Sequence, residues 1–126
     1  RDLKPSNLMI DSNGRVKIID FGLSTCENSH AILNSSKGSF FYKNPFQVKP
    51  GIHQDIYSIG VICIELLSLW KTEMERYVEL SKLPHLPQSI STQFSDVCQY
   101  ISICLKPTST ISADQLLLYL SQLKNK

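Results

Sequence analysis

The chain has 126 residues, of which 42% are hydrophobic and 19% are charged, a balance typical of a globular protein with a core. The formal net charge of +2 predicts neither a direct nucleic-acid partner nor attachment to an anionic membrane. The longest apolar stretch, residues 56–70, is interrupted by Glu65 and is shorter than the about 20 residues that a membrane span needs. We expect one domain, or one part of a larger domain, with no membrane contact in this segment.

The cysteines show no metal-binding spacing. None stands in a C-x-x-C pair and no histidine lies at zinc-site spacing from them; the four are Cys26, Cys63, Cys98 and Cys104. We predict reduced, mostly buried thiols and an intracellular, cytoplasmic protein. Because the chain begins directly on a motif and without an initiator Met, we also expect a truncated sequence.

The first part of the chain predicts a β-hairpin followed by a long loop. Residues 8–10 and 16–19 are strand-like, and the turn signal at residues 11–14 ends in Asn-Gly. Residues 23–43 are polar, rich in Ser, Asn and Lys, and show no helical or strand period. A loop of this length in a compact domain is usually functional or disordered.

The rest of the chain predicts four helices. Residues 56–70 are apolar on nearly all sides, which is typical of a buried helix. Residues 72–83 predict a second helix, whose apolar side would carry Met74, Tyr77, Val78 and Leu80. Between this helix and the next, Pro84 and Pro87 predict an irregular connection.

The third predicted helix opens at Ser91 or Thr92 and ends before Pro107, with apolar residues at helical spacing at Phe94, Val97, Cys98, Ile101 and Leu105. A capping box at residues 112–115 opens the last helix, whose expected apolar face is Leu116, Leu117, Leu120 and Leu123. The expected fold class is mainly α with a small β-hairpin.

Two short motifs carry the chemistry. Residues 2–7 read Asp-Leu-Lys-Pro-Ser-Asn, and residues 20–22 read Asp-Phe-Gly. Phosphoryl transfer needs a carboxylate to accept the hydroxyl proton, a cation to offset phosphoryl charge, and oxygen ligands for Mg²⁺. The residues of the right kinds are Asp2, Lys4, Asn7 and Asp20. The hairpin between the motifs can bring Asn7 and Asp20 side by side.

These motifs resemble the H-R-D-L-x-x-x-N and D-F-G motifs of protein kinases. The resemblance implies a partial protein kinase domain over residues 1–126, in the C-terminal lobe of the α+β protein-kinase-like fold. It divides the chain into a catalytic loop at 1–7, a Mg-binding motif and activation segment at 20–46, and a helical lobe at 55–124. Lys4 resembles the Ser/Thr branch of the family rather than the tyrosine branch.

The resemblance also implies a role for each site residue. Asp2 would be the catalytic base, Lys4 would contact the γ-phosphate of ATP, and Asn7 and Asp20 would bind Mg²⁺. Met9 would form the apolar floor under adenine. The implied cofactors are ATP and Mg²⁺, and the implied partner is a protein substrate with a Ser or Thr acceptor.

Further residues are assigned in the same way. Arg1 would meet a phosphate on the activation segment, Ser39 would lie near the substrate hydroxyl, and Asp55 would hold the catalytic-loop backbone. One family feature is missing, because Phe46 stands where the family has a buried Glu and Thr110 is closest to the position of its Arg partner. Since both partners are absent, no orphan charge remains, and we expect a divergent kinase.

A narrower resemblance is to the kinases of the translation initiation factor 2 α subunit. It rests on Lys-Thr-Glu-Met-Glu-Arg at residues 71–76 and on residues 38–48. It implies that subunit as substrate, a role in translation regulation, and homodimerisation through the N-lobe. The Gly-rich loop and the ATP-contacting Lys of kinases have no counterpart in the chain, so we expect it to be inactive alone. Two alternatives stay open: a non-catalytic kinase-fold regulatory module, and a Ser/Thr kinase of another subfamily.

Overall fold

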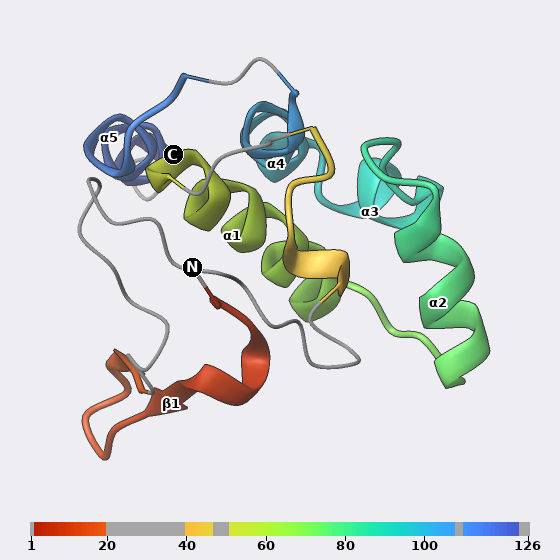
Figure 1. Cartoon of the computed structure of the whole chain (residues 1–126), viewed down its shortest axis with the longest axis horizontal. Coiled ribbons are helices and arrows are strands. Elements are labelled where there is room, and N and C mark those ends of the chain that lie inside the picture. The colour runs from red at the N-terminus through yellow and green to blue at the C-terminus, as the bar shows by residue number, and fades with distance from the viewer. Residues whose placement is uncertain (1, 20–39, 47–50, 108–109, 124–126) are drawn as a thin grey trace.

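The computed structural model describes residues 2–19, 40–46, 51–107 and 110–123. Within these ranges the chain is mostly helical with one two-stranded antiparallel sheet, which confirms the expected fold class (Figure 1). The elements in chain order are η1 Pro5–Asn7, β1 Leu8–Ile10, β2 Val16–Ile18, η2 Phe40–Tyr42, α1 Ile52–Leu67, α2 Glu73–Ser81, α3 Gln88–Gln93, α4 Ser95–Leu105 and α5 Ala113–Leu123.

The predicted hairpin forms, and its turn is closed by one carboxylate. Asp11 Oδ1 accepts hydrogen bonds of 2.9 Å from the backbone N–H groups of both Asn13 and Arg15. Gly14 has a φ of 75°, a backbone conformation that glycine adopts without a steric penalty. The backbone hydrogen bond from Arg15 is the largest of the effects that lower the pKa of Asp11. The turn therefore returns the chain toward the first motif.

The central element is α1, which lies among the other helices with η2 against it (Figure 1). Its side chains at Ile56, Val61 and Ile64 are buried. The helix spans residues 52–67 rather than 56–70. It begins earlier because Gly51 is the extended N-cap, and it ends at the extended residue Ser68, so Leu69 and Trp70 lie in the connection to α2.

Two of the predicted helical faces are wrong. On α2, Met74, Tyr77 and Val78 are exposed and only Leu80 is buried. On α5, only Leu116 is buried, while Leu117 and Leu120 are exposed. Both helices lie at the periphery of the described structure, where one row of side chains is enough to attach a helix to the core (Figure 1).

The predicted third helix is two helices. Phe94, with φ −129° and ψ 44°, separates α3 from α4, so five α-helices rather than four follow the hairpin in the described ranges. Its ring packs against the main core, which favours this break over a continuous helix. The capping box of α5 is confirmed, since Gln115 Oε1 accepts from Ser112 N–H at 2.8 Å and Gln115 N–H donates to Ser112 Oγ at 3.2 Å.

The three cysteines within the described ranges are free thiols, as expected, but only Cys104 is fully buried; Cys63 and Cys98 are partly buried. Burial, and then the proximity of Cys63, raise the pKa of Cys104 to about 12. Cys26 lies outside the described residues. None of the helices described is long and apolar enough to cross a membrane.

The packing of α1 on α4 depends on a glycine. A Cβ atom at Gly60 would lie 2.9 Å from Cys104 Cβ and 3.1 Å from Leu105 Cδ2. Helix propensity alone predicts that Gly60→Ala stabilises the protein by about 1 kcal/mol, whereas overpacking costs about 1–3 kcal/mol. We expect the contact to prevail, so the free energy of unfolding in urea falls. An unchanged or higher value would show that the two helices do not pack this closely.

Candidate active site

The first motif forms a compact cluster of its three predicted side chains. Lys4 Nζ lies 2.9 Å from Asp2 Oδ2. Asn7 Nδ2 donates to the backbone oxygen of Asp2 at 2.8 Å and to Asp2 Oδ2 at 3.3 Å. The Asn7 side chain is buried, with 6% of the residue exposed. A carboxylate, an ammonium group and an amide therefore meet around one carboxylate oxygen.

Local sequence explains why the loop takes this shape. Pro5 occupies the first turn of η1, where its fixed φ suits a helix start. The turn is closed by the hydrogen bond from Asn7 N–H to Lys4 O at 3.0 Å. Leu3 and Leu8, on either side of it, pack against the main hydrophobic core. The polar residues Lys4 and Asn7 therefore lie between two leucines that anchor the loop to the core.

The donor set fits Mg²⁺, which prefers oxygen ligands. Both hydrogen bonds to Asp2 come from Asn7 Nδ2, and the amide Oδ1 accepts none among the residues described. Asp20 lies outside the described residues, but the hairpin ends beside Asn7, where Ile19 N–H donates to Asn7 O at 2.9 Å. Among the described residues, Asn7 Oδ1 is thus an oxygen atom that is suited to bind Mg²⁺. No group of three or more His, Cys, Asp or Glu side chains with metal-binding geometry occurs in the described part of the chain.

The roles assigned to the remaining predicted residues stay predictions. Met9 lies on β1 and is 55% exposed, so its contact with adenine stays a prediction. Asp55 lies in the first turn of α1, and its role toward the catalytic loop also stays a prediction. Arg1 and Ser39 lie outside the described residues.

The segment of residues 40–46 is attached to α1 through its backbone. Gln54 Nε2 donates to Tyr42 O at 2.8 Å, and Gln54 Oε1 accepts from Asn44 N–H at 2.9 Å. Ser58 Oγ, one turn further along α1, donates to the same Tyr42 oxygen at 2.6 Å. One side-chain amide and one hydroxyl therefore satisfy the backbone of this segment.

A second attachment uses the Tyr42 side chain. Its hydroxyl donates to Glu65 Oε2 on α1 and accepts from Arg76 Nη2 on α2 at 3.0 Å. Arg76 Nε lies 2.5 Å from Glu65 Oε1. Only 12% of the Glu65 side chain and 26% of the Arg76 side chain are exposed. Three elements, η2, α1 and α2, are joined by this triad.

The charges of the triad are mutually stabilised. Burial, and then the hydrogen bond to the Glu65 carboxylate, raise the pKa of Tyr42 well above its ordinary value. Partial burial lowers the pKa of Arg76, but hydrogen bonding and charge attraction from Glu65 outweigh it and raise the pKa overall. Tyr42 is therefore a neutral hydroxyl between a carboxylate and a guanidinium.

In the sequence, Glu65 interrupts an apolar run, and no motif points to a role for Gln54. The spacing of residues 54, 58 and 65 places all three on one face of a helix, which was the available signal. A charged residue inside a buried helix is expected to be paired. The distant partners, Tyr42 and Arg76, could not be read from this spacing.

The segment ends at Phe46, which departs from the expected family pattern. Phe46 is half-exposed, and its N–H donates to Asn44 Oδ1 at 2.9 Å. Thr110 is exposed as well. Neither side chain can carry a charge, so the ion pair that the resemblance places at these two positions cannot form between them.

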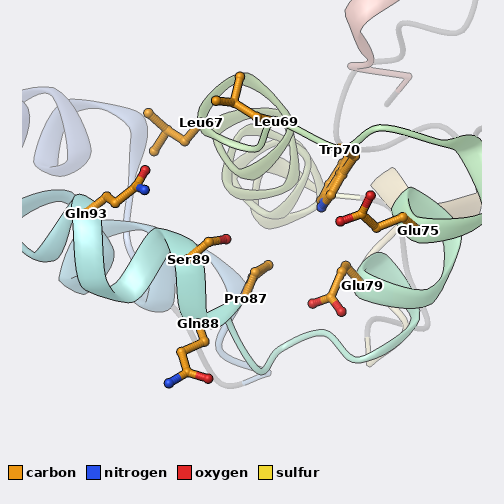
Figure 2. Close-up of a pocket in the computed structure, with 9 residues that line it drawn as sticks. All are labelled: Leu67, Leu69, Trp70, Glu75, Glu79, Pro87, Gln88, Ser89 and Gln93. Atoms are coloured by element: carbon orange, nitrogen blue, oxygen red, sulfur yellow. The ribbon is translucent and has the colours of Figure 1, made fainter.

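A pocket of about 350 Å³ lies elsewhere, between the end of α1, α2 and α3 (Figure 2). Its lining residues are Leu67, Leu69, Trp70, Glu75, Glu79, Pro87, Gln88, Ser89 and Gln93. Figure 2 shows Trp70 projecting into the space between α2 and α3, with the two glutamates opposite Pro87. None of the described catalytic-loop residues lines it, so this pocket is separate from the cluster of Asp2, Lys4 and Asn7.

A family model described as Protein kinase domain matches residues 1–118. Mitogen-activated protein kinase kinase 2 of Arabidopsis thaliana is 34% identical over 136 residues, covering 93% of this chain and 37% of that protein. CBL-interacting protein kinase 5 of Oryza sativa subsp. japonica is 36% identical over 124 residues, covering 88% of this chain and 26% of that protein.

A further relative is the dual specificity mitogen-activated protein kinase kinase sek-1 of Caenorhabditis elegans, 29% identical over 119 residues, with 84% of this chain and 35% of that protein covered. The chain belongs to the protein kinase family, and its described part is consistent with the C-terminal lobe. It spans well under half the length of these relatives.

The backbone attachment gives a test of this site. In Gln54→Ala, the N–H of Asn44 loses its acceptor, and Tyr42 O keeps only the Ser58 hydroxyl. We expect a loss of about 1–3 kcal/mol in the free energy of unfolding, as for removal of a partner from buried polar groups. The matched control is Gln99→Ala on the exposed side of α4. Equal unfolding curves for the two variants would contradict the attachment.

Proposed function

We propose that this chain forms the catalytic-loop half of a protein kinase that transfers the γ-phosphate of ATP to a Ser or Thr hydroxyl of a protein. The observation that carries the proposal is the cluster of Asp2, Lys4 and Asn7, with Lys4 Nζ and Asn7 Nδ2 both within 3.3 Å of one Asp2 oxygen. Membership of the protein kinase family supports the same reaction.

Each residue of the cluster has a distinct task in the proposed reaction. The Asp2 carboxylate accepts a hydrogen bond from the acceptor hydroxyl, orients its oxygen, and takes up its proton. Lys4 places positive charge beside the transferring phosphoryl group. Asn7 Oδ1, together with Asp20, would hold Mg²⁺, which neutralises charge on the ATP phosphates. The hydrogen bonds from Asn7 Nδ2 fix the Asp2 backbone and carboxylate during this step.

The acceptor class is proposed from Lys4 and from the relatives together. Lys4 resembles the Ser/Thr branch, whereas the C. elegans relative is named a dual specificity kinase. We propose Ser and Thr as acceptors and a cytoplasmic site of action. Analysis of the phosphorylated amino acids on a labelled substrate separates Ser and Thr from Tyr.

The initiation factor 2 α subunit is a narrower substrate proposal, supported by residues 71–76. The structure assigns several of these residues local roles. Thr72 caps α2, with Glu75 N–H donating to its Oγ1 at 3.1 Å, and Arg76 points to Glu65. Within the resembling segment, Met74 is a large exposed side chain. Recognition of that subunit on this surface would thus depend on Met74 and its exposed neighbours.

A phosphorylation assay tests the proposed reaction. In a complete kinase domain that contains this chain, Asp2→Asn keeps a similar shape but removes the base, so we expect labelling of a protein substrate to fall by about 10²–10⁴-fold. Asp114→Asn, on the exposed first turn of α5, is the matched control and should retain full activity. Radiolabelled ATP, generic protein substrates and the initiation factor 2 α subunit are compared.

The outcomes separate the candidate functions. Asp2-dependent labelling of generic substrates but not of the initiation factor subunit would keep the kinase and remove the narrower substrate. Absence of any Asp2-dependent transfer, from a folded protein with Mg²⁺ and ATP present, would contradict the enzyme and favour a regulatory kinase-fold module.

A further inference from the structure

Two neighbouring residues of α2 contact two neighbouring residues of η2. Arg76 donates to the Tyr42 hydroxyl at 3.0 Å, and the Tyr77 ring meets the Phe41 ring edge-on with centroids 5.3 Å apart. The only buried residue of α2 itself is Leu80. The first half of this helix is therefore joined to the rest of the structure mainly through residues 41, 42 and 65.

Glu65 links the two residues of the contact between α2 and η2, Arg76 and Tyr42. Its two carboxylate oxygens are divided between the Tyr42 hydroxyl and Arg76 Nε. Because Arg76 also donates to the Tyr42 hydroxyl, the three groups form a closed ring of hydrogen bonds. A planar guanidinium can make two such bonds in a fixed geometry, whereas an ammonium group cannot reproduce that fork. The position of Tyr42 thus depends on Arg76 as well as on α1.

The catalytic loop shares a core with this segment. Tyr42 belongs to the main hydrophobic cluster, and Phe41, Leu3 and Leu8 pack against the same cluster. Leu3 lies next to Asp2 in the chain, and Leu8 lies next to Asn7. A displacement of residues 40–46 would consequently disturb the core contacts that also hold the catalytic loop.

We infer that Arg76 is a positioning residue for protein-substrate binding, which holds residues 40–46 in register with the catalytic loop through Glu65 and Tyr42. This inference rests on the proposed kinase function and on the resemblance of residues 20–46 to the Mg-binding motif and activation segment of kinases. Arg76 itself points inward to Glu65, so it acts through Tyr42 and not by touching substrate.

Steady-state kinetics of a complete kinase domain containing the chain provide the first test. Arg76→Met should lower kcat/KM for a protein substrate by about tenfold, mainly through KM, while KM for ATP changes by less than about twofold. Arg76→Lys should recover part of this loss, because it restores charge without the fork. Lys82→Met removes the cation of the residue that caps the C-terminus of α2, which forms a surface ion pair with Glu79, and should match the wild type.

A double-mutant cycle separates coupling from general damage. Because Arg76 acts through Glu65, Glu65→Gln combined with Arg76→Met should be no worse than Arg76→Met alone. Equal increases in KM for ATP and in KM for the protein substrate would overturn the positioning role. Additive effects of the two substitutions on kcat/KM would overturn it as well.

A readout without catalysis keeps this test independent of the kinase proposal. Amide hydrogen exchange at Lys43 and Asn44 should be about tenfold faster in Arg76→Met than in Lys82→Met. If the wild type transfers no phosphate but this difference in exchange occurs, the kinase proposal fails while the attachment stands. If exchange at these amides is the same in both variants, the inference is wrong whatever the activity.

Discussion

The fold depends on a single buried helix that carries one polar face. The middle of α1 is largely apolar and buried, yet Gln54, Ser58 and Glu65 face the segment of residues 40–46 and satisfy its polar groups. A carboxylate can lie in this environment only when it is paired, and removal of one partner of a buried pair costs about 3–5 kcal/mol. Glu65 therefore needs Arg76 and Tyr42 as partners for its nearly buried carboxylate, and these two residues in turn are held in place by Glu65.

This constraint links the helices to the chemistry. The catalytic loop reaches the core through Leu3 and Leu8, and the segment that follows the Asp-Phe-Gly motif reaches it through Tyr42 and Phe41. The catalytic loop and this segment therefore pack against the same core, to which α1 contributes, although they are separated along the chain. The missing ion pair at Phe46 and Thr110 is compatible with this arrangement, since residues 42–44 and 46 have their own hydrogen-bond partners.

The local features were the most predictable from sequence. The hairpin followed from strand-like runs around Asn-Gly and the α5 start from a capping box. The motif in the short loop identified Asp2, Lys4 and Asn7 as candidates, although their mutual contacts were not predicted. All of these depend on residues close together in the chain. The family assignment was equally accessible, because residues 1–118 carry its motifs in order.

The features that were mispredicted depend on distant partners. The exposed faces of α2 and α5 were expected to be buried, because helical periodicity identifies an apolar stripe but not what covers it. The break at Phe94 depends on packing of its ring in the core. The triad joins residues 42, 65 and 76, and nothing in the local sequence of any one of them identifies the other two.

The most direct test of the account is a structure of a complete kinase domain containing this chain, with Mg²⁺ and a non-hydrolysable ATP analogue. The account predicts Asn7 Oδ1 about 2.0–2.1 Å from Mg²⁺, with Lys4 Nζ at the terminal phosphate and Asp2 facing the acceptor side. A bound nucleotide whose Mg²⁺ makes no contact with Asn7, or a domain that excludes nucleotide while keeping the Asp2 cluster intact, would contradict it.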